Sequence, residues 1–195
     1  MLKEKDRLIH FIQNSGLVSQ QGAAAIAGHF QEKNTSKNEF FLKEGRISDE
    51  YLFLEQGFMR SFTHDINGNE VTTHFYAPDQ IVFEVASYFN RSISRESIQA
   101  LTDCGGWFIR YEQLNTLFHS IPEFREFGRS ILVKGFVALK QRMLSVINET
   151  AEKRYAALIK SNPEIFQNAP LKAIASYIGI TDTSLSRIRK EFAKK

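Results

Sequence analysis

The sequence predicts an α+β protein in which a strand-rich region is followed by helices. Residues 40–110 contain short aromatic and β-branched runs separated by turn residues, which is typical of an all-β sandwich or barrel. Residues 123–148 contain no proline and carry apolar residues at alternating spacings of four and three, which predicts one long helix. Residues 171–192 hold two further helical patterns around a glycine, which predicts a helical hairpin near the C-terminus.

The composition excludes several protein classes. The chain has 195 residues, of which 43% are hydrophobic and 24% are charged, so disorder as the dominant state is excluded. The single cysteine, Cys104, excludes a disulfide framework, a four-cysteine zinc site and an iron–sulfur cluster held by one chain. Residues 1–13 carry five charges and no apolar run reaches membrane-spanning length, so we expect no signal peptide and no membrane partner. The expected location is the cytoplasm.

Two short helices are expected in the first thirty residues. The first helix has an apolar stripe formed by Leu8, Ile9, Phe11 and Ile12. Ser19 is a suitable N-cap for the second helix, because its hydroxyl can accept a hydrogen bond from a backbone N–H of the first turn. The second helix contains Ala23, Ala24, Ile26, Ala27 and Phe30.

The Asn67-Gly68 pair predicts a two-residue type I′ hairpin, since both residues tolerate positive φ. The register that follows pairs Ile66 with Asn69, His64 with Val71, Phe62 with Thr73 and Ser61 with His74. His64 and His74 then lie on opposite faces of the hairpin, so they cannot share an ion and no metal site is predicted. The sequence has no Ser-His-Asp order, P-loop or G-x-G-x-x-G motif, so we expect no enzyme.

The pattern is helical after Tyr111. A short helix with Leu114, Leu117 and Phe118 ends before Pro122, and the long helix follows at 123–148. The apolar seam of the long helix consists of Leu132, Phe136, Leu139, Met143 and Val146. This spacing favours pairing of two copies as a short coiled coil, and packing of the helix on its own β-domain is the alternative.

The segment LKAIASYIGITDTSLSRIRKEF, residues 171–192, has the pattern of a helix-turn-helix. Ala175 is the small residue at the helix crossing, Gly179 permits a left-handed turn, and Thr181 is a suitable N-cap for the second helix. The inner faces carry Ile174, Ile178, Ile180, Leu185, Ile188 and Phe192. An αα-hairpin with a solvated basic face is the alternative interpretation.

The outer face of the second helix suits a DNA groove. A turn of 100° per residue places Arg187 opposite the apolar side, where its guanidinium can make a bidentate contact to guanine. Residues 1–148 hold 16 Lys and Arg against 17 Asp and Glu, whereas residues 149–195 hold 9 against 5, so positive charge is concentrated in the C-terminal segment. The predicted DNA-binding residues are Lys172, Thr181, Thr183, Ser186, Arg187, Arg189 and Lys190.

With these motifs the chain resembles, over nearly its full length, the catabolite-activator and fumarate-nitrate-regulator (Crp/Fnr) family of bacterial transcription regulators. FFLKEGRISDEYLFLEQGFMRSF looks like the early strands of that family, and ASYIGITDTSLSRIRKEF looks like its DNA-reading helices. Arg187 matches the recognition-helix arginine, whereas Asp182 and Thr183 replace a neighbouring arginine and glutamate. SNPEIFQNAP is too short for the β-hairpin wing of many relatives.

The resemblance implies a cupin-like, cyclic-nucleotide-binding-like β-roll with flanking helices, then a long dimerisation helix and a C-terminal helix-turn-helix. It implies a homodimer that binds double-stranded DNA, with RNA polymerase as a further partner. The corresponding division of the chain is an effector domain at 1–121, a dimerisation helix at 122–148 and a DNA-binding domain at 149–195.

The resemblance also locates an effector pocket. In the cyclic-nucleotide binders of the family, a Gly-Glu pair holds the ribose, and an Arg followed by Ser or Thr holds the cyclic phosphate. Here Glu84 matches the glutamate, but Phe83 replaces the glycine. The Arg-Ser position falls on Ser94-Arg95 or Glu96-Ser97, neither in the expected order.

Arg91 or Arg95 offers a substitute for the phosphate-binding arginine, but the adjacent Glu96 repels a phosphate. The pocket residues are Phe83, Glu84, Arg91, Ser94, Arg95 and Ser97. Cyclic nucleotide binding is therefore disfavoured and no cofactor is expected.

The expected function is that of a homodimeric regulator that reads an inverted-repeat site through residues 182–192 and responds to an unknown signal in the β-roll. The alternative is a small-molecule sensor or cupin-like enzyme whose C-terminal helices only mediate assembly.

Overall fold

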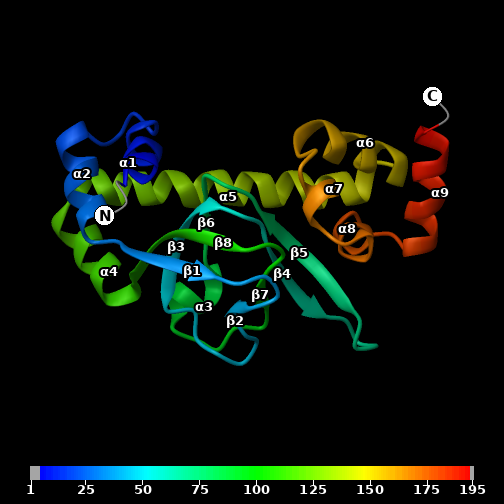
Figure 1. Ribbon diagram of the computed structural model, residues 1–195, viewed down its shortest axis with the longest axis horizontal. Coiled ribbons are helices and arrows are strands. Elements are labelled where there is room, and N and C mark those ends of the chain that lie inside the picture. The colour runs from blue at the N-terminus through cyan, green and yellow to red at the C-terminus, as the bar shows by residue number, and fades with distance from the viewer. Residues whose placement is uncertain (1–4, 194–195) are drawn as a thin grey trace.

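The structure, a computed structural model, describes residues 5–193. A β-roll occupies the middle of the molecule, and the helix α5 (Pro122–Asn148) runs behind it along the longest axis (Figure 1). The N-terminal helices lie at one end of α5, and helices α6 to α9 lie at the other end. Within the described residues, no helix combines the length and apolar character needed to cross a bilayer.

The two N-terminal helices form as the sequence predicts. They are α1 (Asp6–Gln13) and α2 (Gln20–Gly28), and Leu8, Ile12 and Ile26 are buried between them and the β-roll. The hydroxyl of Ser19 accepts a hydrogen bond of 3.1 Å from the N–H of Gly22, which confirms the predicted N-cap.

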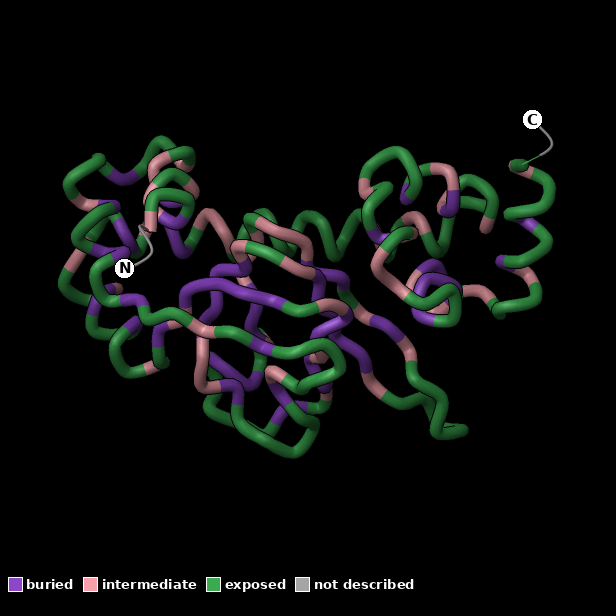
Figure 2. Tube along the Cα trace, in the orientation of Figure 1, coloured by how far each residue is buried: buried purple, intermediate pink, exposed green. Residues whose placement is uncertain are grey.

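The β-roll consists of two four-stranded antiparallel sheets, which confirms the predicted all-β sandwich or barrel. One sheet has the order β1 (Gln31–Thr35), β8 (Cys104–Arg110), β3 (Glu50–Gln56) and β6 (Gln80–Val82). The other has the order β2 (Phe40–Leu42), β7 (Ser97–Ala100), β4 (Met59–His64) and β5 (Glu70–Tyr76). Figure 2 shows buried residues concentrated in these strands.

Two elements of this region depart from the sequence prediction. Strand β1 lies before the predicted strand region. It is an edge strand with mostly exposed residues, so its sequence QEKNT lacks the apolar pattern that would predict a strand. Helix α3 (Val85–Asn90) lies between the strands and was not predicted. Its apolar run is too short to show whether the residues follow the period of a helix or that of a strand.

The predicted type I′ hairpin is wrong. Only Gly68 of the pair has positive φ, at 80°, and the N–H of Gly68 donates to the carbonyl of Asp65 over 3.0 Å. The N–H of Asp65 donates to Asn69, which makes this a three-residue turn of the bulged kind. The carboxylate of Asp65 accepts bonds from the N–H groups of Asn67 and Asn69, and this stabilises the longer turn.

The longer turn shifts the register near it by one residue. His64 pairs with Glu70 rather than Val71, Phe62 pairs with Thr72 rather than Thr73, and Asn69 lies opposite Asp65 rather than Ile66. A β-bulge between Ser61 and Phe62 then restores the predicted pairing of Ser61 with His74. The part of the chain that the structure describes contains no group of three or more His, Cys, Asp or Glu arranged to hold a metal.

Helix α4 (Tyr111–Ser120) and α5 form as predicted. The first turns of α5 bury Phe124 and Phe127 in the core of the N-terminal half. Gly128 lies directly under the ring of Phe118, where an added Cβ would stand 2.7 Å from ring carbons. α4 and α5 can approach this closely only because position 128 has no side chain.

The C-terminal module comprises α6 (Ala151–Ser161), α7 (Ile165–Asn168), α8 (Leu171–Tyr177) and α9 (Asp182–Phe192). Its core is continuous with Phe58, Phe75 and Leu101 of the β-roll. The module therefore packs against the β-roll rather than extending freely from the end of α5.

Candidate nucleic-acid interface and effector site

The turn between α8 and α9 has the geometry of a helix-turn-helix. Gly179 has a φ of 74°, and the N–H of Ile180 donates to the carbonyl of Ala175 over 3.0 Å. The N–H of Gly179 donates to Ser176, so that the two bonds close a Schellman motif and satisfy the last carbonyls of α8. Ala175 is fully buried, as a residue at the helix crossing must be.

Helix α9 begins and packs as the sequence predicts. The hydroxyl of Thr181 accepts a hydrogen bond of 3.2 Å from the N–H of Ser184, so Thr181 is its N-cap. Leu185 and Ile188 are buried, and the ring of Phe192 meets the ring of Tyr155 edge to face, with centroids 5.1 Å apart. These contacts fix the rotation of α9 about its axis, and this decides which side chains face outward.

All seven predicted DNA-binding residues are exposed. Four of them lie on one face of α9 at spacings of three and four residues: Thr183, Ser186, Arg187 and Lys190. The other three lie elsewhere: Arg189 on a different side of α9, Thr181 at its cap and Lys172 on α8. The exposed face thus brings together one guanidinium, one ammonium and two hydroxyl groups on a rigid helix.

Sequence reasoning missed the side chain that joins α5, the β-roll and the C-terminal module. The guanidinium of Arg142 donates to the carbonyls of Thr73 and Tyr177, over 3.0 and 2.9 Å, and to that of Thr72 over 3.4 Å. It also lies 4.2 Å from the centre of the Tyr177 ring. We call this set of contacts the Arg142 clamp. Its acceptors are backbone groups, which no residue pattern marks.

Two further contacts support the clamp. The hydroxyl of Ser176 accepts a bond of 3.1 Å from the N–H of Thr72, and the rings of Phe75 and Tyr177 meet at 5.0 Å. Desolvation, with a smaller effect from the charge of Arg142, lowers the pKa of His74 to about 4. His74 is therefore neutral at pH 7 and does not repel the guanidinium.

The predicted seam of α5 is exposed along its length. Phe136 is 67% exposed and Met143 is 54% exposed. Four further apolar residues of α5 are also exposed and were not part of the prediction: Val133, Val137, Leu144 and Ile147. An apolar surface of this extent on one helix is typical of a protein–protein contact.

The first half of the predicted effector pocket is occupied by bonds within the protein. Glu84 is the N-cap of α3, and its carboxylate accepts bonds of 3.1 and 2.6 Å from the N–H groups of Ala86 and Ser87. Phe83 packs against Tyr51 and Tyr88. The carboxylate that the resemblance assigns to a ribose therefore stabilises the start of a helix.

Arg91, the candidate phosphate ligand after α3, is also engaged. Its guanidinium donates to the carbonyl of Ser48 over 3.2 Å and to the carboxylate of Asp49 over 2.5 Å, and it stacks on the ring of Tyr111. Its backbone has a φ of 53°, so it also ends α3 in the left-handed conformation.

Ser94 and Ser97 of the predicted pocket also form hydrogen bonds within the protein. The hydroxyl of Ser94 donates to the carbonyl of Glu96 and accepts from the Glu96 N–H, and that of Ser97 accepts from the N–H of Glu44. Arg95 is exposed. Burial raises the pKa of Glu96, and the charge of Glu84 raises it further. Glu84, Arg91, Ser94 and Ser97 therefore already have hydrogen-bond partners within the protein.

Cys104 is buried, and its thiol contacts the carbonyls of Phe58 and Thr102 at 3.3 Å. Burial raises the pKa of this thiol. It is therefore a packed side chain rather than a reactive one.

Comparison with known proteins identifies similar proteins for the β-roll and for most of the chain. The family model of the cyclic nucleotide-binding domain matches residues 32–120. The transcriptional activator protein Anr of Pseudomonas protegens is 21% identical over 168 residues, which cover 80% of this chain and 68% of that protein.

Two solved structures share the fold. The structure of FixK2 from Bradyrhizobium japonicum has a TM-score of 0.71 at 16% identity and covers 85% of each chain. A transcriptional regulator from Eubacterium rectale, assigned to the Crp/Fnr family, has a TM-score of 0.73 at 15% identity and covers 94% of this chain and 88% of that one.

Proposed function

Because the chain belongs to the Crp/Fnr family of transcription regulators, we propose that it binds an inverted-repeat DNA site as a homodimer, with α9 in the major groove. The observation that carries the proposal is the outward face of α9, where Arg187 and Lys190 lie with two hydroxyl groups on a helix whose rotation is fixed by its buried side. Arg187 reads a guanine, and the remaining groups contact base edges or phosphate.

The proposed dimer forms through α5. Its exposed seam runs from Leu132 to Val146, and pairing two copies removes this apolar surface from water. A dimer also doubles the charge of the C-terminal segment, which holds 9 Lys and Arg against 5 Asp and Glu. In this proposal residues 1–121 are the effector domain, 122–148 the dimerisation helix and 149–195 the DNA-binding domain. The similar proteins are regulators, and the proposed role contains no catalytic step.

Selection of bound sequences from random duplex DNA tests the proposal. We expect an inverted repeat whose half-sites are about 34 Å apart, one turn of the double helix. Binding should weaken steeply with added salt, because each phosphate contact releases counterions. Recovery of no common sequence would contradict sequence-specific reading, and recovery of a single unrepeated half-site would contradict the dimer.

We further propose that the effector domain controls DNA binding through the Arg142 clamp. The clamp joins α5 to β5 and to the last turn of α8, so it holds the C-terminal module in one orientation relative to the β-roll. A signal that moves β5 changes the stability of the clamped orientation. The dimer then shifts between a clamped and a released population.

Replacing Arg142 by Gln should release the C-terminal module. The change removes charge-assisted hydrogen bonds to backbone carbonyls, which stabilise the docked module by about 2 kcal/mol. Amide hydrogen exchange in residues 171–192 should therefore accelerate by at least about tenfold, whereas exchange in α1 and α2 should not change. Arg129→Gln is the matched control, since Arg129 lies on the same helix and pairs with Glu126 of that helix. Equal exchange in wild type and R142Q would refute the clamp.

Cyclic AMP should not bind the effector domain at micromolar concentration. Both carboxylate oxygens of Glu84 already accept backbone bonds, and Glu96 stands between Arg95 and Ser97 in the sequence, where its charge repels a phosphate. Isothermal titration calorimetry measures this directly. Tight binding would show that Arg91 or Arg95 rearranges to hold the phosphate.

A further inference from the structure

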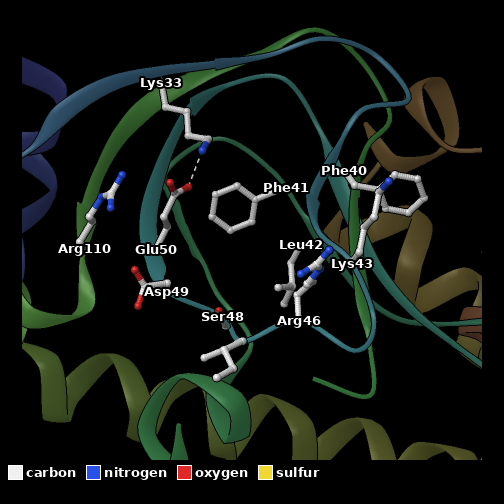
Figure 3. Close-up of a pocket in the computed structure, with 11 residues that line it drawn as sticks. Lys33, Phe40, Phe41, Leu42, Lys43, Arg46, Ser48, Asp49, Glu50 and Arg110 are labelled. Carbon is white, nitrogen blue, oxygen red and sulfur yellow. Dashed lines mark hydrogen bonds and ion pairs between the residues drawn. The ribbon is translucent and has the colours of Figure 1, made fainter. Parts of the chain in front are cut away.

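A second feature of the β-roll lies next to the predicted effector pocket. A hollow of about 370 Å³ is lined by β1, β8 and β3 of one sheet, by β2 of the other, and by the loop from Lys43 to Asp49 (Figure 3). Its volume lies within the range of small-molecule sites. None of the six predicted pocket residues lines it.

The hollow contains more positive than negative charge. Two carboxylates line it, and both are engaged: Glu50 pairs with Lys33, and Asp49 pairs with Arg91, which lies outside the hollow. Three more cations line it: Lys43, Arg46 and Arg110. Among residues 5–193, no carboxylate forms an ion pair with any of these three side chains. An anion in the hollow would relieve the repulsion between them.

Apolar surface lies beside these cations. Phe40 is 37% exposed and Ile47 is 43% exposed. In Figure 3 the ring of Phe41 lies between Arg110 on one side and Arg46 on the other. A ligand with a flat apolar group can therefore pack on this apolar surface. The two guanidinium groups beside it prefer carboxylate and phosphate partners.

We propose that this hollow binds a small organic anion, with its carboxylate or phosphate held by one of the two guanidinium groups, Arg46 or Arg110, and its apolar body against Phe40, Phe41 and Ile47. The hollow is connected to α3 by Ser48. The N–H of Ser48 donates to the hydroxyl of Ser87 over 2.8 Å, and its own hydroxyl accepts from the N–H of Glu84. A ligand in the hollow thus contacts the loop that supports the start of α3.

The proposal does not rest on DNA binding, and its test uses none. The full-length protein is titrated with phenyl phosphate, benzoate, inorganic phosphate and phenol, and the amide NMR signals of residues 43–49 and of Arg110 are followed. Phenyl phosphate or benzoate should give saturable shifts at these residues, and the stronger of the two identifies the preferred anion. Inorganic phosphate and phenol should each bind more weakly, because each supplies only one half of the ligand.

The double variant Arg46→Gln with Arg110→Gln should weaken binding of the preferred probe by at least about tenfold, as expected for the loss of charge-assisted hydrogen bonds. Lys37→Gln is the control for loss of a single positive charge elsewhere, because Lys37 is an exposed lysine on the turn between β1 and β2. Arg95→Gln is the control for the predicted effector pocket. Neither should alter binding, and thermal melting of each variant establishes that it is folded.

Three outcomes would overturn the proposal. Unchanged affinity in the double variant would show that the hollow is not the site, and loss of binding in R95Q would assign the anion to the predicted effector pocket. If neither organic anion binds, but the double variant loses binding to an acidic peptide such as oligoglutamate, the hollow contacts a protein partner instead.

Discussion

Replacing Arg187 by Ala should reduce affinity for the selected inverted repeat by at least about 30-fold, because a bidentate contact to guanine is lost in each of two subunits. The side chain is exposed on α9, whereas Leu185 and Ile188 form the buried side, so the variant should fold normally. Fluorescence anisotropy with labelled duplexes at several salt concentrations measures the effect. The loss should be concentrated on the guanine that Arg187 reads, with relaxed preference at that base pair.

Two comparisons make this experiment specific. Lys190→Ala should weaken binding to all duplexes alike and lower the salt dependence, since a phosphate contact carries no sequence preference. Lys160→Ala removes a lysine of the same module that lies on α6, so it should have little effect beyond net charge. If R187A binds every duplex as the wild type does, α9 is not the reading helix and the DNA-binding proposal fails.

Replacing both Phe136 and Met143 by Glu should convert the protein to monomers. In a paired α5 these two positions face the partner, so the double variant would place four carboxylates in an apolar seam, where burial of unpaired charge is costly. The isolated subunit should stay folded, because both side chains are already more than half exposed. Sedimentation velocity at micromolar concentration distinguishes the two states.

The matched control introduces two glutamates on the opposite side of α5. Lys134 and Gln141 are exposed and lie away from the seam, so Lys134→Glu with Gln141→Glu should remain dimeric. A dimer that persists in the Phe136 and Met143 variant would place the interface elsewhere. The monomeric variant should also bind the inverted repeat no more tightly than one half-site.

The features that the sequence predicted correctly depend on neighbours in the chain. Gly179, Thr181 and the apolar residues of α8 and α9 are local signals for a turn, a cap and a buried face, and all three form as expected. The predicted type I′ hairpin is wrong because the side chain of Asp65 stabilises a longer turn. A single nearby carboxylate was enough to change the turn type and the local register.

The features that were missed depend on contacts between distant segments. In the sequence, nothing distinguishes Arg142 from the other charged residues of the long helix. Its three acceptors are backbone carbonyls about 35 and 70 residues away in sequence. The predicted effector residues were placed near α3 and β7, but which of them already have hydrogen-bond partners depends on Ser48, Glu44 and Asp49 from other strands and loops. Residue identity alone does not show whether a polar group is available to a ligand.

The Arg142 clamp also bears on how the two subunits of the proposed dimer influence each other. Arg142 lies one residue from Met143 and one helical turn from Leu139, so the same stretch of α5 faces both the partner helix and the clamp. The dimer would then have two Arg142 clamps, one on each side of its two-fold axis. A rotation of α5 that loosens one clamp also changes the angle between the two paired helices, and this changes the position of α5 in the other subunit. The response to an effector is therefore expected to be cooperative between subunits, with a Hill coefficient between about 1 and 2.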